Sequence, residues 1–229
     1  MAATEFDRRL AEIAIAEWWM FGSQFLDNDE LNIPIYQELG HHGKKAEESN
    51  SGFRHRIWTY WRMGVYRSKA SKWKKYRDVS QFPWSAAFIS YCMRAAGAGG
   101  NFPYHKGHWF YVNIAMRNKI NGQTGAAIVA YDLDETEPQV GDLLWYGTGA
   151  ASKHWSYADL EKQVRGGVTW YSSHCDIVTE VDRVNNQLYA IGGNVGDRVL
   201  RLQSKLKKKN GRLKSKQYKV IIRNNITGP

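Results

Sequence analysis

The chain has 229 residues, of which 43% are hydrophobic and 14% are aromatic. This length and apolar content support one folded domain with a sizeable core and exclude a disordered chain. The mean hydropathy is −0.57 and no apolar run approaches twenty residues, so the sequence predicts no membrane span. A formal net charge of +10 favours polyanionic partners such as nucleic acid, anionic lipid or a cell-wall polymer.

Cysteine content and the first residues bear on the cellular compartment. Cys92 and Cys175 are the only cysteines, which is too few for a disulfide framework or a zinc-type spacing. The chain begins with an amphipathic helix pattern, not with a basic segment and an apolar core, so no signal peptide is predicted. We expect synthesis in the cytoplasm; action in the periplasm or cell envelope would then require delivery by a secretion system or a phage.

The hydrophobic periodicity changes along the chain. The first part, about residues 1–125, predicts helices over residues 4–21, 53–65, 85–96 and 109–118. The second part, about residues 138–226, predicts strands over residues 141–146, 174–182, 187–191, 198–203 and 218–223. Helices followed by antiparallel strands are typical of an α+β fold, and we expect a single domain over residues 1–229.

Two other segments have their own patterns. Residues 147–171 predict a long loop with a short helix over residues 157–164, of the kind that borders a site. The pair Asn210-Gly211 lies between the predicted strands at residues 198–203 and 218–223, which indicates a basic hairpin that contains the lysine run of residues 205–209. We interpret this run as a solvated edge, because it has no aromatic side chains for base stacking. The basic stretch of residues 54–77 contains tryptophans at helical spacing, which favours core positions over a polyanion site.

Residues 82–90, Phe-Pro-Trp-Ser-Ala-Ala-Phe-Ile-Ser, place Ser85 where a helix is expected to begin. The first turn of a helix has unpaired backbone N–H groups and a partial positive charge, which stabilise developing negative charge. Ser85 therefore has two interpretations. It either caps or simply begins the helix, or it is the nucleophile of an acyl-transfer reaction.

A base for Ser85 is expected on the strand at residues 174–182. His174 and Asp176 alternate onto one face of this strand, while Cys175, Ile177 and Val181 form its apolar face. His174 is the candidate base. A polar neighbour would orient its imidazole, and the candidates are Asn194 on the following strand and Asp176 in reserve.

The position of Asn194 depends on the hairpin between the two strands. A three-residue loop would place Asn194 opposite Asp176, within reach of the imidazole. A two-residue loop would place it opposite Ile177, on the wrong face, unless a bulge at Gly192-Gly193 intervened. Both alternatives remain open from the sequence.

A nucleophile at a helix start, a base on a strand and a polar residue on the next strand resemble the papain-like cell-wall hydrolases of the NlpC and CHAP kind. In those proteins a cysteine occupies the position of Ser85. The resemblance implies a papain-like fold with helices packed on an antiparallel sheet. The matching segments are Trp84-Ser85-Ala86-Ala87-Phe88, Gly141-Asp142-Leu143-Leu144, His174 and Gly193-Asn194.

More narrowly, the chain resembles the bacterial domain-of-unknown-function family 2272 over nearly its whole length. The matching features are Glu17-Trp18, Phe21-Gly22, Arg56, Tyr60-Trp61, residues 83–90, His108, Tyr111, residues 174–178 and residues 191–195. The broader resemblance implies a peptidoglycan endopeptidase or amidase that needs no cofactor, often a phage-borne or secreted antibacterial toxin. A cognate inhibitor protein would then be a partner, and His108 and Trp84 would contact the substrate.

Serine at the nucleophile position changes the chemistry. A helix dipole contributes only about 0.3–2 kcal/mol, which is too little to ionise a hydroxyl, so Ser85 needs a general base within about 2.6–3.2 Å. The alternative is a degenerate or silenced site in a module that binds an anionic wall polymer or nucleic acid. A metal site at His105 and His108 lacks a further ligand pattern, so we predict none.

Overall fold

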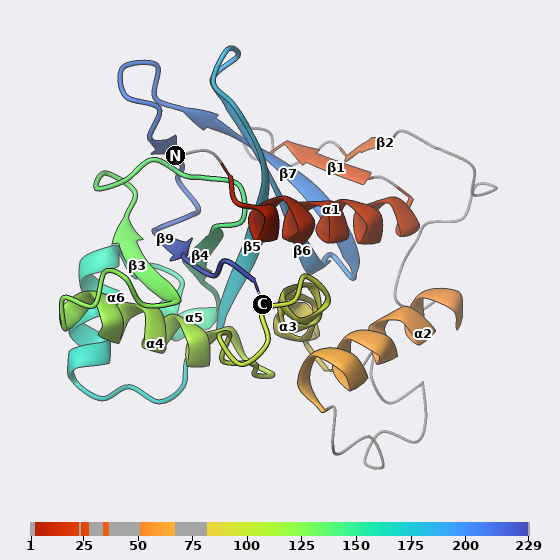
Figure 1. Cartoon of the computed structure of the whole chain (residues 1–229), viewed down its shortest axis with the longest axis horizontal. Coiled ribbons are helices and arrows are strands. Elements are labelled where there is room, and N and C mark those ends of the chain that lie inside the picture. The colour runs from red at the N-terminus through yellow and green to blue at the C-terminus, as the bar shows by residue number, and fades with distance from the viewer. Residues whose placement is uncertain (1–2, 23, 28–33, 37–50, 67–81, 229) are drawn as a thin grey trace.

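The computed structural model describes residues 3–22, 24–27, 34–36, 51–66 and 82–228, which form an α+β fold (Figure 1). The helices are α1 (Glu5–Met20), α2 (Ser51–Thr59), the π-helix η1 (Tyr60–Val65), α3 (Ser85–Ala95), α4 (His108–Ile120), α5 (Gly149–Ser152) and α6 (Tyr157–Arg165). The strands are β1 (Gln24–Asp27), β2 (Pro34–Tyr36), β3 (Ile128–Asp132), β4 (Leu143–Gly147), β5 (Ser173–Asp182), β6 (Gln187–Val195), β7 (Arg198–Leu206), β8 (Leu213–Lys214) and β9 (Val220–Asn224).

The predicted α+β class is confirmed, as are the four long helices, the short helix α6 and the five predicted strands. The prediction missed β3, whose run of apolar residues is short, and it missed the brief strands β1, β2 and β8. The helix predicted over residues 53–65 is regular only as far as Thr59 and continues as η1. Helices α3 and α6 begin at the predicted residues.

The strands form one sheet in the order β2-β1-β7-β6-β5-β4-β9-β3, and β8 pairs with the last two residues of β7, Lys205 and Leu206. Strands β3 to β9 pair antiparallel, whereas β1 joins β7 in parallel. Helix α1 crosses β5 and β6 on one face, and α3 lies beside it (Figure 1). The main hydrophobic cluster fills the space between these helices and the sheet, so both parts of the chain share it.

The predicted basic hairpin is present, but its second strand is β8 and not, as predicted, the strand at residues 218–223. Strand β9 pairs instead with β3 and β4. Lys205 pairs with Lys214 and Leu206 with Leu213, and Gly211 takes the left-handed conformation that the turn requires. Both leucines enter the smaller hydrophobic cluster, while Lys208 and Lys209 are exposed. None of the helices in the described ranges is both long and apolar enough to cross a bilayer.

The basic stretch of residues 54–77 is described only to residue 66. Within that part, Trp61 is buried in the main cluster and Trp58 packs against it, so the core interpretation is confirmed for both. Residues 67–77, including Trp73, lie outside the described residues.

A buried ion pair ties α1 to α2, η1 and α3. The Glu17 carboxylate accepts a hydrogen bond from Arg56 Nε at 2.7 Å and another from the Tyr60 hydroxyl at 2.7 Å. Arg56 also donates to the Tyr91 hydroxyl at 2.7 Å, and its guanidinium lies over both tyrosine rings. The bond to Glu17 raises the pKa of Arg56. Losing one partner would leave the other as a buried charge without compensation.

Asp142 anchors β4 to β9 from a fully buried position. Its carboxylate accepts hydrogen bonds from the backbone N–H groups of Gln139 at 2.8 Å and Asn224 at 3.2 Å, and Arg223 Nε lies 3.2 Å away. Burial raises the pKa of Asp142 to about 7, although Arg223 opposes this shift. The Gly-Asp segment at residues 141–142 therefore has a structural role, since its carboxylate satisfies backbone groups of neighbouring segments.

Replacing Glu17 by alanine is expected to lower the free energy of unfolding by about 3–5 kcal/mol, because Arg56 loses its buried counter-charge. Glu12→Ala, on the exposed side of the same helix, is the matched control and should change it by less than about 0.5 kcal/mol. Urea denaturation measures both values. Equal losses in the two variants would show that the buried pair adds nothing specific.

Asp142→Asn is expected to change how stability depends on pH. The native carboxyl keeps its proton between about pH 4 and 7, where the unfolded chain has released it, so the free energy of unfolding of the wild type falls as pH rises through that window. The slope from this one group is at most about 1.4 kcal/mol per pH unit.

Asparagine cannot titrate, so the variant should lack this contribution. Urea denaturation between pH 4.5 and 8 measures the difference in slope. Asp134→Asn is the control, because that carboxylate is exposed and its pKa is lowered by Lys207, outside the window. Parallel pH profiles for wild type and Asp142→Asn would contradict the assignment.

Candidate functional site

Ser85 is the first residue of α3, as predicted, but its side chain does not cap the helix. Trp84 is the N-cap residue and makes no capping hydrogen bond with its side chain. Ser85 Oγ instead lies 2.6 Å from His108 Nε2, in a buried contact between α3 and the start of α4. This distance is within the range that general base catalysis requires.

Close packing fixes the start of α3. The Trp84 indole is fully buried against the rings of Phe21 and Tyr60. Two glycines let the neighbouring backbones approach: a Cβ at Gly64 would lie 2.7 Å from Ala87 O, and a Cβ at Gly193 would lie 2.6 Å from Phe88 Cβ. Helix α3 thus sits directly against η1 and β6. Trp84 belongs to this core contact and does not line the cavity in front of Ser85.

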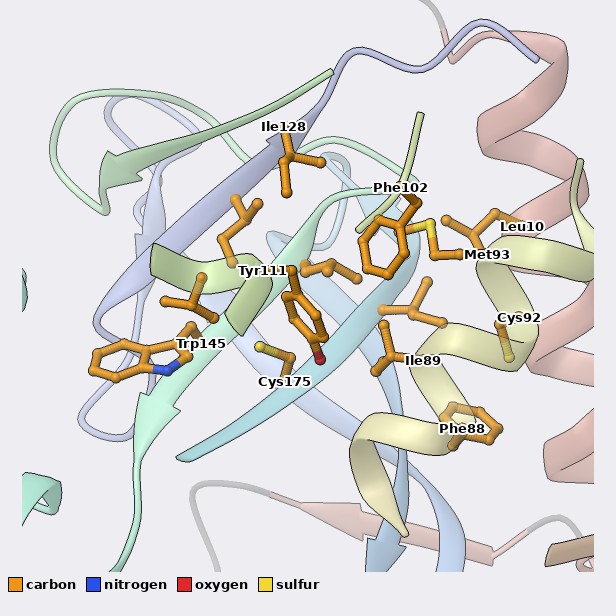
Figure 2. Close-up of a cluster of buried hydrophobic side chains, with 14 of the residues drawn as sticks. Leu10, Phe88, Ile89, Cys92, Met93, Phe102, Tyr111, Ile128, Trp145 and Cys175 are labelled. Carbon is orange, nitrogen blue, oxygen red and sulfur yellow. The ribbon is translucent and has the colours of Figure 1, made fainter. Parts of the chain in front are cut away.

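His108 connects Ser85 to a hydrogen-bond chain within α4. Its Nδ1 atom is hydrogen-bonded to the hydroxyl of Tyr111, one helical turn away, and the Tyr111 side chain is buried beside Cys175. Figure 2 shows the Tyr111 side chain directed at Cys175. The two hydrogen bonds of His108 are both satisfied when the Ser85 hydroxyl donates to Nε2 and Nδ1–H donates to the Tyr111 oxygen.

Burial lowers the pKa of His108 well below its usual value, and the nearby His174 lowers it further. His108 is therefore neutral at neutral pH, with Nε2 free to accept the Ser85 proton. The same surroundings disfavour a positive charge on the His108 imidazole.

His174 belongs to a second hydrogen-bond chain beside the first. Its Nε2 atom lies 2.9 Å from Asp176 Oδ1, and the other carboxylate oxygen accepts a hydrogen bond from the Tyr218 hydroxyl at 2.8 Å. The His174 ring centroid is 5.2 Å from that of His108. Among the described residues, the hydrogen-bond partner of Ser85 is His108 and that of His174 is Asp176. The structure thus brings His174 together with the reserve orienter.

The hairpin register differs from both alternatives that the sequence left open. The β5–β6 turn has four residues, 183–186, with Asp182 paired to Gln187, and a bulge at Thr179 shifts the register again. Ile177 pairs with Ile191, which places Gly192 beside Asp176: a Cβ at Gly192 would lie 1.7 Å from Asp176 Oδ1. Glycine at this position leaves the space that the Asp176 and His174 side chains occupy.

Asn194 lies beyond this point, at a second irregularity between Gly193 and Val195, with a left-handed φ of 61°. The hydrogen bonds of the described residues include none between Asn194 and His174.

The face predicted for Val181 is wrong because of the bulge at Thr179. The extra residue reverses the alternation, so Val181 packs against the smaller cluster, whereas Cys175 and Ile177 lie in the main one.

Ser85 and His108 open into a cavity of about 460 Å³ between α3, α4 and the segment before β5. Aromatic side chains form much of its wall, and the indole of Trp170 is 68% exposed at its rim. His108 was predicted to contact the substrate, and it does line this cavity. The remaining lining residues are Trp61, Phe82, Pro83, Ala86, His105, Lys106, Gly107, Trp109, Thr148, Tyr171, Ser172 and Ser173.

Neither cysteine lies at the cavity. Cys92 and Cys175 are fully buried in the main cluster, and burial raises the pKa of both thiols (Figure 2). This confirms the core position expected for Cys175. His105 stacks on Phe110 and its Nδ1 accepts a hydrogen bond from the N–H of Gly107 at 3.0 Å. In the described ranges, no three His, Cys, Asp or Glu side chains group as a metal site would require.

A family model described as "Uncharacterized protein conserved in bacteria (DUF2272)" matches residues 47–224. The chain belongs to this family. The matched range contains Ser85, His108, Tyr111, His174 and Asp176, so both hydrogen-bond chains lie within the family's domain. Searches among curated proteins and among solved structures find no match.

The pKa of His108 is expected to lie well below its usual value of 6.5. A titration of the imidazole signals by NMR, with His108 assigned through the loss of its signal in His108→Gln, measures this value. Unfolding in urea removes the burial, so the same ring should then titrate near about 6.5. A titration midpoint of His108 at or above pH 6.5 in the folded protein would contradict the conclusion that burial keeps this imidazole neutral.

Proposed function

We propose that the protein hydrolyses an amide bond of peptidoglycan, with Ser85 as nucleophile and His108 as general base. The observation that carries this proposal is the 2.6 Å contact between Ser85 Oγ and His108 Nε2 at the wall of an open cavity. Serine hydrolases use the same arrangement, in which a serine shares a hydrogen bond with a neutral imidazole.

The reaction proceeds in two halves. His108 Nε2 takes the hydroxyl proton as Ser85 Oγ bonds to the carbonyl carbon of the substrate. The carbonyl oxygen becomes negative next to the first backbone N–H groups of α3, where the helix supplies positive partial charge. The C–N bond then breaks as His108 returns the proton to the leaving amine. Water, deprotonated by His108, hydrolyses the acyl-serine ester, which releases the acid and restores Ser85.

The second hydrogen-bond chain supports this chemistry. The protonated form of His108 is costly in its buried position, and Tyr111 offers it only a neutral oxygen. The second chain contains the Asp176 carboxylate, which is held by His174 and Tyr218. We assign Asp176 the role of stabilising the positive charge on His108, and His174 the role of holding the Asp176 carboxylate in place. His174 is thus a positioning residue in this mechanism, whereas the sequence alone pointed to it as the base.

The substrate class rests on the sequence resemblance to papain-like cell-wall hydrolases and on the character of the cavity. Exposed aromatic side chains at Phe82 and Trp170 border it, and such side chains stack on extended polymers at low entropic cost. A net charge of +10 attracts an anionic wall. The protein would act in the envelope after delivery by a secretion system or a phage, as an antibacterial toxin with a cognate inhibitor.

The alternative is a catalytically inactive papain-like module that binds an anionic polymer. The lowered pKa of His108 is the observation that favours it, because a weaker base takes a serine proton less readily. Wall binding that weakens steeply with salt, with no fragment released at any protein concentration, would support this alternative.

The wild-type protein is expected to release soluble fragments from purified peptidoglycan, and Ser85→Ala and His108→Ala should each lower the rate at least about a thousandfold. His174→Ala should lower it less, because that variant keeps the nucleophile and the base. Chromatography of the released fragments measures these rates and identifies the bond that is cut.

His55→Ala, on the exposed side of α2, is the matched control for His108→Ala and should retain full activity. Circular dichroism checks that each variant is folded. Full activity in Ser85→Ala would remove the mechanism. Equal inactivation by His108→Ala and His174→Ala, with an unchanged fold, would return the general base to His174.

A further inference from the structure

A second hollow of about 450 Å³ adjoins the cavity of Ser85 and shares Thr148 with it. We call it the lysine hollow. It is formed by the end of β4, the segment after α5 and the segment before β9. The lining residues are Tyr146, Gly147, Thr148, Gly149, Lys153, His154, Lys216, Gln217 and Lys219.

The charge in this hollow has one sign. Lys153, Lys216 and Lys219 line it together with His154, and no carboxylate is among the lining residues. Of the ion pairs between described residues, none includes these three lysines. Several other surface cations do pair with carboxylates, as Lys119 does with Glu135. The lysine hollow thus concentrates positive charge, and no carboxylate of the described residues forms an ion pair with its three lysines.

The backbone that carries two of these lysines is held firmly. The Ser215 hydroxyl accepts hydrogen bonds from the N–H groups of Gln217 at 3.1 Å and Tyr218 at 2.8 Å. The N–H of Lys219 donates to Trp145 O at 2.9 Å, and Lys219 Nζ donates to Lys216 O at 2.7 Å. Lys216 and Lys219 therefore project from a fixed turn, which lowers the entropy lost when they bind a ligand.

The hollow also contacts the second hydrogen-bond chain. Tyr146 is one of its walls, and the Tyr146 ring lies 5.3 Å from that of His174 and 5.7 Å from that of Tyr218. Thr148, which borders both cavities, is tied to the segment before β5 by a hydrogen bond from its N–H to Ser172 O at 2.9 Å. An extended substrate in the Ser85 cavity can thus continue past Thr148 into the lysine hollow.

We propose that the lysine hollow is a subsite that binds a carboxylate of the peptide whose amide bond Ser85 attacks. This inference rests on the proposed function, which makes the substrate a peptide. Ammonium groups recognise a carboxylate by charge-assisted hydrogen bonds. The subsite would position the scissile amide by holding a charged group of the same peptide, so that binding energy from a non-reacting part orients the reacting carbonyl.

The test measures binding to Ser85→Ala protein, so it needs no turnover and stays separate from the proposed hydrolysis. Calorimetry compares a synthetic wall-type stem peptide that has free carboxylates with the same peptide amidated at those carboxylates. We expect the carboxylate form to bind at least about tenfold more tightly, which corresponds to about 1.4 kcal/mol, and the difference to shrink as salt is added.

The triple change Lys153→Gln, Lys216→Gln and Lys219→Gln should remove that difference. The matched control is Lys208→Gln, Lys209→Gln and Lys214→Gln in the β7–β8 hairpin, which removes the same charge from another surface and should keep it. Equal binding of the two peptides, no binding of either, or an equal loss in the control variant would overturn the subsite. Binding of a glycerol phosphate oligomer without binding of the peptide would also overturn it, in favour of a phosphate polymer.

Discussion

The close approach of α3 to η1 and β6 is the constraint on which the site depends. It requires glycine at positions 64 and 193, where any Cβ would collide with the backbone or core of α3. Because the helix is held there, its first residue meets the first residue of α4, and Ser85 reaches His108. The buried pair of Glu17 and Arg56 reinforces the same arrangement by joining α1 and α2 to Tyr91 of α3.

The two hydrogen-bond chains differ in what they can stabilise. The chain from Ser85 through His108 ends in neutral, apolar surroundings at Tyr111 and Cys175, which keeps the imidazole uncharged. The chain from His174 contains the carboxylate of Asp176. Since their imidazole rings are neighbours, the first chain presents an unprotonated acceptor while the second places negative charge nearby. In the proposed mechanism, the first chain provides the neutral base and the second provides the carboxylate that stabilises this base once it is protonated.

Local patterns predicted much of this arrangement, and tertiary contacts decided the rest. The helix start at Ser85 follows from Pro83 and the apolar run after it, and the shared face of His174 and Asp176 follows from strand alternation. The register of Asn194 could not be predicted from the sequence, because the bulge at Thr179 arises from pairing between strands. The contact between Ser85 and His108 depends on the path of residues 97–107, and these residues have no hydrophobic periodicity from which that path could be predicted. The spacing of His108 and Tyr111 by one helical turn, in contrast, can be seen in the sequence.

The burial of both thiols has a consequence for resistance to oxidation. A cysteine nucleophile exposed in the Ser85 cavity would convert readily to sulfenic and then sulfinic acid, whereas a serine hydroxyl has no comparable reaction. Cys92 and Cys175 are fully buried, and none of the described residues that line the cavity contains sulfur. Peroxide and thiol-alkylating reagents that inactivate cysteine hydrolases would therefore find no thiol to modify at this site.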